Sequence, residues 1–301
     1  MPADASNRAK GSGASVLNIL LAVLSMVAQG TSDFIYKRAQ ERGVVFESYF
    51  AVECVPFAGV ALLFGYLMEG LIINQATVLY GLVFGVFSFW AVYFFVTSLR
   101  EGEVGVNTLI FRLNFVLVAV FAILWLGEPW TAAVGAGLIF AALGIASVTL
   151  LAGRRKTSGT GSGRSIGLAL LAMVLFAMLG VTLKIGIQEG ANIGWAIVLG
   201  SLSWAVCACI LVVVRKRYSM PRANWVFLPV TGCLKAVSFT LMLFAFRRGG
   251  NASVVVPIVQ LSFLVTMVWA AMFLGEPLTR SKIIGLTFAV AAILAFSAQG
   301  G

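Results

Sequence analysis

The sequence contains no histidine, few charged residues, four cysteines and seven prolines. Without histidine the chain lacks the commonest proton shuttle and metal ligand, which argues against haem and zinc chemistry. The cysteines form no Cys-x-x-Cys pair, which favours packing roles over disulfides or a metal site. Charged residues make up 11 % of the 301 residues, whereas a soluble domain carries about 25 %. These absences exclude an ordinary soluble enzyme and a disulfide-stabilised secreted module.

Hydrophobic residues make up 60 % of the chain, and the mean hydropathy is +1.01. They stand in long unbroken runs rather than in the alternating pattern of β-barrel strands, so we expect helices of about 20 residues that cross a bilayer. The sequence therefore predicts an all-α integral membrane protein with short connecting loops. Its ten transmembrane helices are expected at about 15–36, 44–68, 76–99, 104–126, 131–152, 165–187, 191–214, 224–246, 252–274 and 281–299.

The first fourteen residues are small and polar and precede an apolar stretch, as in a signal peptide. We favour a retained helix, because the span continues through Gln29 and Asp33 and has a matching copy later in the chain. The predicted organisation is a polar tail, a first five-helix repeat, a linker and a second five-helix repeat. Their expected bounds are 1–14, 15–152, 153–164 and 165–301.

An internal repeat is the most specific signal in the sequence. The segment Gly-Glu-Pro-Trp-Thr at 127–131 recurs as Gly-Glu-Pro-Leu-Thr at 275–279, 148 residues later, and the match extends without a gap to either side. Each half holds five spans, and because five is odd the second half must be inverted in the membrane. Inverted repeats are typical of secondary transporters, whose substrate site lies near the midplane between the halves.

The repeated segment predicts a structural corner rather than a substrate contact. Glycine is expected to end one helix, proline to start the next, and glutamate to lie near the positive N-terminus of that next helix. The corner residues are Gly127, Glu128 and Pro129 in the first half and Gly275, Glu276 and Pro277 in the second.

These features resemble the drug/metabolite transporter superfamily, in its EamA-like branch. The resemblance rests on the ten spans, the duplication, the two Gly-Glu-x-x-Thr corners and the opening helix with Gly-Thr-Ser-Asp-Phe at 30–34. It implies a cavity lined by spans 1, 3, 4, 6, 8 and 9, with spans 5 and 10 at the periphery. It specifies the transporter class well and the substrate poorly.

Ionisable side chains inside a bilayer are costly and are candidates for function. The spans contain three acids and three bases, namely Asp33, Glu47, Glu53, Arg112, Lys184 and Lys235. Span 1 carries a polar stripe at helical spacing that is expected to meet the cavity, although hydrogen bonds between helices would explain it too. The stripe comprises Ser25, Gln29, Ser32, Asp33 and Tyr36.

Arg112 in span 4 aligns with Gln260 in span 9, and we expect the two to form a symmetry-related polar pair in the cavity. An arginine fork suits a carboxylate or phosphate, but a structural ion pair between Arg112 and Glu53 fits the sequence equally well. Lys235 in span 8 is expected to bind substrate or a coupling ion, with a structural pair as the alternative. Pro257 predicts a hinge or a broken helix in span 9.

Span 3 is rich in aromatic residues, and Trp90 and Tyr93 share one of its faces. That face could stack on an apolar part of a solute, while lipid contact and packing explain it at least as well. The substrate-binding set predicted from the sequence is Gln29, Asp33, Trp90, Tyr93, Arg112, Lys235 and Gln260.

The sequence predicts a secondary transporter that exports a small amino acid or organic acid by alternating access. The alternative within the same class is efflux of cationic drugs by proton exchange through Asp33 or Glu53. A membrane-embedded enzyme is disfavoured because acids are scattered and histidine is absent, and a channel or scaffold is a fourth hypothesis. We expect no cofactor, no metal and no nucleic-acid partner, and the sequence neither requires nor excludes a homodimer.

Ten spans place both termini on one side of the cell membrane. Fourteen lysines and arginines lie on the loops between spans 1 and 2, 3 and 4, 5 and 6, 7 and 8, and 9 and 10, against four on the opposite side. The positive-inside rule therefore predicts termini outside the cytoplasm, whereas the resemblance favours termini inside. The net charge of +10 thus reports orientation rather than an acidic partner.

Overall fold

The computed structural model of the chain describes residues 3–70, 72–101, 104–153, 163–216, 218–275 and 279–298, which form twelve helices and no strand. The first half contains α1 (Ala3–Glu41), α2 (Phe46–Glu69), α3 (Gln75–Glu101), α4 (Val104–Arg112), α5 (Asn114–Leu126) and α6 (Ala132–Gly153). The second half contains α7 (Gly163–Gln188), α8 (Ile193–Arg215), α9 (Arg222–Arg247), α10 (Ala252–Gln260), α11 (Ser262–Leu274) and α12 (Arg280–Ser297). Helix α1 begins at Ala3, so residues of the predicted polar tail belong to the first helix.

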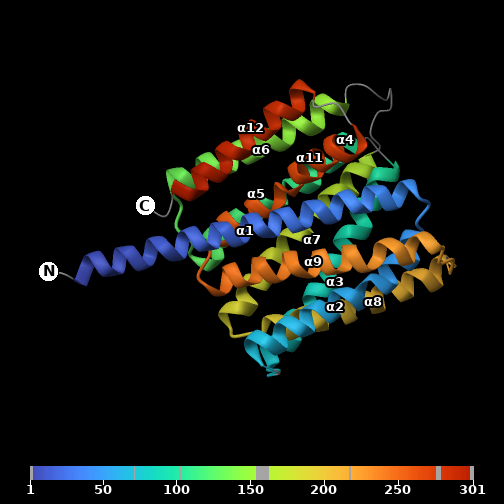
Figure 1. Cartoon of the computed structure of the whole chain (residues 1–301), viewed down its shortest axis with the longest axis horizontal. Coiled ribbons are helices and arrows are strands. Elements are labelled where there is room, and N and C mark those ends of the chain that lie inside the picture. The colour runs from blue at the N-terminus through green and yellow to red at the C-terminus, as the bar shows by residue number, and fades with distance from the viewer. Residues whose placement is uncertain are drawn as a thin grey trace.

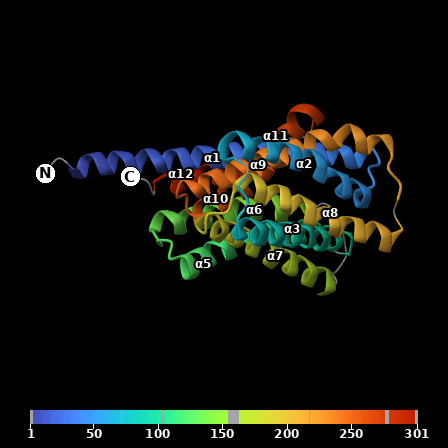
Figure 2. The ribbon, with the colours of Figure 1, turned by 90° about the horizontal axis from the view of Figure 1, so that it is seen from below.

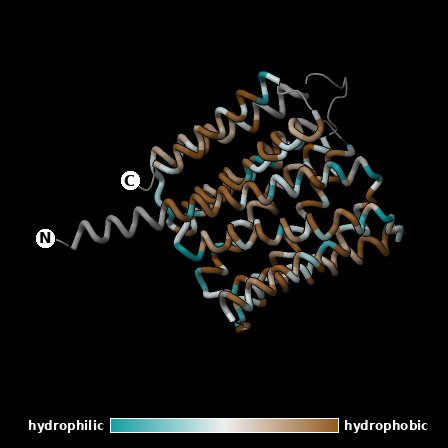
Figure 3. Tube along the Cα trace, viewed as in Figure 1, coloured by the Kyte–Doolittle hydropathy of each residue, from teal (hydrophilic) through white to brown (hydrophobic). Residues whose placement is uncertain are grey.

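The twelve helices make ten membrane spans, as the sequence predicted. Eight spans are long and apolar enough to cross a bilayer, and two shorter apolar helices run over Ile110–Leu126 and Ala132–Ser147. Helices α4 and α5 together form one span, and α10 and α11 form its counterpart in the second half. Figure 3 shows hydrophobic residues along the helices and hydrophilic ones gathered near their ends.

The packing of the helices follows the inverted duplication. Helix α1 packs against α9 and α11, and its counterpart α7 packs against α3 and α5. Helices α2 and α8 pack against each other, as do α6 and α12, at opposite edges of the molecule (Figure 1). The all-α fold of two inverted five-helix repeats is therefore confirmed.

Four helices form two facing layers in the middle of the molecule. Helices α1 and α9 make one layer and α3 and α7 the other, as Figure 2 shows. Helix α1 starts and α12 finishes at the same edge of the molecule (Figures 1 and 2). Helix α3 approaches α8 closely at Gly81 and Gly85, where a Cβ on Gly85 would lie 2.0 Å from the carbonyl oxygen of Gly200.

Both discontinuous spans break at equivalent positions, Leu113 and Leu261. Each leucine has ψ near zero, and its N–H donates three residues back, to the carbonyl of Ile110 at 3.2 Å or of Ile258 at 3.1 Å. The break in span 9 therefore lies four residues beyond Pro257, where the sequence predicted a hinge. Because the same break occurs in span 4 without a proline, proline is not its cause.

Candidate substrate site

A cavity of about 250 Å³ lies between the two central layers, beside both helix breaks. Side chains from both halves line it, from α1, α2, α3 and α4 on one side of the duplication and from α7, α9, α10 and α11 on the other. Neither α6 nor α12 contributes, as expected for peripheral spans. The site thus lies at the interface of the inverted repeats, where discontinuous helices of transporters bind substrate.

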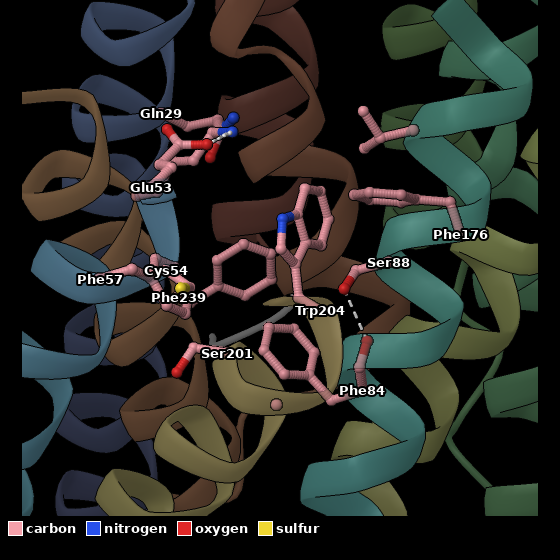
Figure 4. A pocket seen from close by; sticks show the side chains of 13 residues that line it. Gln29, Glu53, Cys54, Phe57, Phe84, Ser88, Phe176, Ser201, Trp204 and Phe239 are labelled. Carbon is pink, nitrogen blue, oxygen red and sulfur yellow. Dashed lines mark hydrogen bonds and ion pairs between the residues drawn. The ribbon is translucent and has the colours of Figure 1, made fainter. Parts of the chain in front are cut away.

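A smaller chamber of about 110 Å³ adjoins this cavity and shares Gln29, Phe176, Lys235 and two other lining residues with it. Its walls are largely aromatic, and the rings of Phe84 and Phe239 meet edge to face at 5.1 Å. Figure 4 shows these rings and Trp204 around the chamber. Trp204 comes from α8 and Phe57 from α2, so two helices that the sequence left out of the cavity line this chamber.

An ion pair between Asp33 and Arg112 lies in the wall of the larger cavity. The guanidinium Nη2 of Arg112 lies 3.6 Å from the Asp33 carboxylate, and the side chains are 18 % and 27 % exposed. Arg112 also donates to the carbonyl of Gln260 and to the hydroxyl of Ser262, both at 3.2 Å. The carbonyl left free by the break in span 9 is therefore satisfied by an arginine from the other half.

A second ion pair joins Lys235 on α9 to Glu53 on α2. Lys235 Nζ lies 3.4 Å from Glu53 Oε2, donates to the hydroxyl of Tyr36 at 2.6 Å and lies 4.2 Å from the centre of that ring. The side chain of Lys235 is 18 % exposed and that of Glu53 is 5 % exposed. The alternative pair Arg112–Glu53 is therefore wrong, because Arg112 pairs with Asp33 and Glu53 pairs with Lys235.

The polar stripe of span 1 serves both of the roles that the sequence left open. Gln29, Asp33 and Tyr36 line the cavity, and Gln29 donates to the Asp33 carboxylate at 3.1 Å. Ser25 and Ser32 instead donate to backbone carbonyls of α9.

Gln260 lines the cavity, but its side chain does not pair with the Arg112 side chain. The amide of Gln260 donates to Asn114 Oδ1 at 3.1 Å, and Asn114 in turn donates to the carbonyl of Phe111 at the break in span 4. Arg112 and Gln260 thus meet through the Gln260 backbone carbonyl. The two breaks are held together by this pair of reciprocal contacts.

Trp90 and Tyr93 line neither of the two cavities. The ring of Trp90 is 37 % exposed and stacks on Phe94, while the hydroxyl of Tyr93 accepts a hydrogen bond from Arg215 at 2.8 Å. Contrary to the prediction, the helix face that Trp90 and Tyr93 share does not line the substrate cavity. The aromatic walls of the smaller chamber come from other rings, one of which is Phe84 on the same helix, α3.

The corner at 127–131 differs from its predicted geometry in two respects. Gly127 ends α5 in the left-handed conformation with φ 66°, as expected, and Gly275 ends α11 with φ 64°. Pro129 does not start α6, because that helix begins at Ala132. The hydroxyl of Thr131, just before the helix, accepts a hydrogen bond from the Val134 N–H at 3.2 Å. Glu276 and Pro277 lie outside the described residues.

Glu128 binds the N-terminus of α10 in the other half rather than the helix that follows it. Its carboxylate accepts hydrogen bonds from the Ala252 N–H at 2.7 Å, the Ser253 N–H at 2.9 Å and the Ser253 hydroxyl at 2.7 Å. Lys184 adds a contact from α7 to the Gly250 carbonyl just before α10. Glu128 therefore ties the first half to the half-helix that carries Gln260 into the cavity.

Among the residues that the structure describes, no three His, Cys, Asp or Glu side chains gather at one point. The four cysteines are free. The polar groups that line the two cavities include two acids, two bases, two amides, a tyrosine and four serines, a set suited to binding a polar organic solute.

The sequence profile of the EamA-like transporter family matches residues 16–150 and again residues 163–298. The chain belongs to this family. The two matches coincide with the inverted halves, as the resemblance to the drug/metabolite transporters implied. The EamA-like chain is also similar to an uncharacterised transporter encoded in the cobO 3′ region of a Sinorhizobium species, with 26 % identity over 133 residues. That match covers 42 % of this chain and 91 % of the Sinorhizobium protein.

The same fold occurs in a crystal structure of another protein, with a TM-score of 0.73 and 14 % identity. That match covers 94 % of this chain and 97 % of the other. The family match and the membrane spans together make the protein a multi-pass membrane transporter of small molecules, embedded in a lipid bilayer.

Proposed function

We propose that the protein is a secondary transporter that carries a small metabolite with a carboxylate group, an amino acid or a similar organic acid, across the cell membrane by alternating access. One observation supports this proposal: two ion pairs line the two adjoining cavities between the inverted halves. Asp33 and Arg112 line the larger cavity, Glu53 lines the smaller chamber, and Lys235 lines both. Their N···O distances of 3.6 Å and 3.4 Å exceed the 2.7–2.9 Å of a strong charge-assisted hydrogen bond. Loose pairs of this kind can exchange a partner for a charged group of the solute.

An amino acid complements this arrangement well. Its carboxylate can bind to Arg112 or Lys235, its ammonium group to Asp33, and an apolar side chain can enter the aromatic chamber beside Trp204. The four site charges sum to zero, so a zwitterion adds no net charge to the site. Transport follows the concentration gradient of the solute, and we propose export from cells that accumulate it.

Efflux of cationic drugs receives less support from the same geometry. Asp33 and Glu53 already have cationic partners, so a drug cation would have to displace Arg112 or Lys235. Each displaced base would then be left without its acid.

The orientation of the chain in the cell membrane is a separate proposal. We infer that the edge with most lysines and arginines faces the cytoplasm and that both termini face the outside. A reporter enzyme that is active only in the cytoplasm, fused after the last residue, is expected to be silent. Its activity would reverse the orientation.

A thermal-shift panel on the detergent-purified protein tests the solute class. L-leucine, L-phenylalanine and 4-methyl-2-oxopentanoate represent the proposed carboxylates, and tetraphenylphosphonium represents the cations. A ligand present at 100 times its Kd stabilises the folded state by about 2.7 kcal/mol. We expect carboxylates to raise the melting temperature of the wild type and not that of Arg112→Ala. A shift with tetraphenylphosphonium alone would favour the cation-efflux alternative.

The aromatic chamber is tested by a matched pair of tryptophan variants. Trp204→Ala removes a wall of the chamber, and we expect the affinity for L-phenylalanine to fall about tenfold, which corresponds to about 1.4 kcal/mol. Trp90→Ala removes a similar ring outside both cavities and is expected to leave the affinity unchanged. Equal losses in the two variants would exclude the chamber as the binding site of the side chain.

A further inference from the structure

Glu53 is the most deeply buried acid of the site, and one of its oxygens has no partner. Its side chain is 5 % exposed, and Oε2 lies 3.4 Å from Lys235. Oε1 is buried and accepts no hydrogen bond from the described residues. Glu53 and Lys235 both line the aromatic chamber, and Figure 4 labels Glu53 among the side chains that line it. The charge on this carboxylate therefore depends strongly on the lysine.

The other titratable groups around Glu53 do not offer a replacement for that lysine. Tyr36 of α1 shares a side-chain hydrogen bond with the Glu53 carboxylate, and Asp33 interacts with Tyr36. Tyr49 and Cys54 of α2 interact with Glu53, and Cys209 of α8 interacts with Cys54. None of these groups carries a positive charge. A solute carboxylate that binds Lys235 would leave Glu53 as a buried anion without a cationic partner, which costs several kcal/mol. Protonation removes that cost, because a neutral carboxyl is far easier to bury.

We propose that Glu53 is a proton-binding site, and that it takes up one proton when a solute carboxylate displaces it from Lys235. A proton from cavity water forms an O–H bond with the Glu53 carboxylate, and the Lys235–Glu53 ion pair is replaced by an ion pair between Lys235 and the solute. For a solute that carries one carboxylate and no ammonium group, the charges of the site sum to zero before and after binding. A zwitterionic amino acid that binds together with the proton leaves the loaded site with one positive charge. This inference rests on the proposed carboxylate solute and adds that one proton crosses with it.

Movement of a proton together with the solute affects the direction of solute transport. An inward proton gradient favours uptake of the solute, so export requires an internal excess of solute that outweighs the proton gradient. The transporter would then release its solute only from cells that have accumulated it.

The first test needs no solute, because Lys235→Met reproduces the loss of the lysine. We expect an infrared difference spectrum at pH 7 to show one protonated carboxyl per chain in Lys235→Met that is absent from the wild type. The band should vanish in the double variant Lys235→Met/Glu53→Gln and should not appear in Lys184→Met, which removes another membrane lysine. Lys235→Gln provides the same test if Lys235→Met does not fold. No carboxyl band assignable to Glu53 in either variant would overturn the proposal.

The second test follows proton and solute together in proteoliposomes with a trapped pH-sensitive dye, using L-leucine and L-phenylalanine as probes. We expect one proton to move with each labelled molecule. The affinity for the probe should fall about tenfold per pH unit wherever Glu53 is deprotonated in the empty site and protonated in the loaded site. In Glu53→Gln, exchange of labelled for unlabelled solute should persist without proton movement or pH dependence. Solute movement in the wild type without protons would overturn the proposal. The infrared band without any movement of the probes would support the proton site and contradict the proposed solute.

Discussion

Glu128 connects the two halves of the transporter, and its removal gives the best-defined stability prediction. The carboxylate is 8 % exposed and accepts three hydrogen bonds from the N-terminus of α10. A hydrogen bond to a charged group contributes about 1.5–3 kcal/mol. Glu128→Ala breaks all three and leaves the N–H groups of Ala252 and Ser253 buried without an acceptor, so we expect a loss of about 3–5 kcal/mol.

Glu128→Gln is the conservative version of this change. The amide oxygen can keep the two contacts with Ser253, but the N–H of Ala252 then faces an amide NH₂ and the negative charge at the N-terminus of α10 is lost. These two effects together cost about 2 kcal/mol. Large domains lose about 2–4 °C of Tm for each kcal/mol, so we expect a drop of about 4–8 °C for the glutamine variant and about twice that for alanine.

The assay is thermal unfolding of the purified protein in detergent, with Glu101→Gln as the matched control. Glu101 pairs with Arg164 at 3.4 Å where the arginine is 75 % exposed, and such surface pairs contribute about 0–1 kcal/mol. We therefore expect the control to shift Tm by about 4 °C or less. A Glu128→Ala protein as stable as the control would refute the account of this contact.

Two further predictions concern the contacts of α1. Gly30→Ala would place its Cβ 2.3 Å from the Ser262 carbonyl oxygen, so we expect it to push α1 away from the break in span 9 and to lower Tm, whereas Gly59→Ala, with open space around its Cβ, should leave Tm unchanged or slightly raised. An equal effect at both glycines would contradict the close approach. Asp33→Asn and Arg112→Gln should each destabilise the protein, and the double variant should be about 1–2 kcal/mol more stable than the sum of the two changes. Additive Tm shifts would show that the pair does not interact.

The sequence was sufficient to predict the spans and the inverted duplication, because the bilayer thickness sets helix length and two copies of a Gly-Glu-Pro corner set the repeat. The helix breaks were predicted only in part, because a broken helix was expected in span 9 but not in span 4. In span 9 the break was expected at Pro257 but lies four residues later, at Leu261. In span 4 no proline or glycine marks the break at Leu113. What distinguishes Leu113 and Leu261 is the reciprocal contact of their neighbours across the two halves, which only the folded structure brings together.

The charged residues of the site were identified by their cost in the bilayer, but their pairing required geometry. Three acids and three bases within the spans allow several pairings, and the one pairing that the sequence suggested, Arg112 with Glu53, was wrong. The rotation of each membrane helix is also poorly marked, since apolar residues surround it on all sides. For this reason Trp90 and Tyr93 were expected at the cavity, while the rings that line the chamber come from Phe84, Trp204 and Phe239.

The partner of Glu128 shows the same limit at a longer range. Its position just before a helix favoured a contact with that helix, as local capping rules suggest. The structure instead pairs it with a helix start 124 residues away, because the duplication places the N-terminus of α10 beside the corner of the first half. Long-range capping of this kind leaves no local signal in the sequence.

Counterflow in proteoliposomes tests the central claim most directly, namely that a carrier site between the halves binds a carboxylate solute. Vesicles that contain the purified protein are loaded with unlabelled L-leucine or L-phenylalanine and diluted into a trace of the labelled compound. The account predicts transient accumulation of label inside the vesicles, lost in Arg112→Ala and Lys235→Ala and retained in Trp90→Ala. Equilibration without accumulation would indicate a pore, and accumulation that survives the loss of both Arg112 and Lys235 would contradict the site described here.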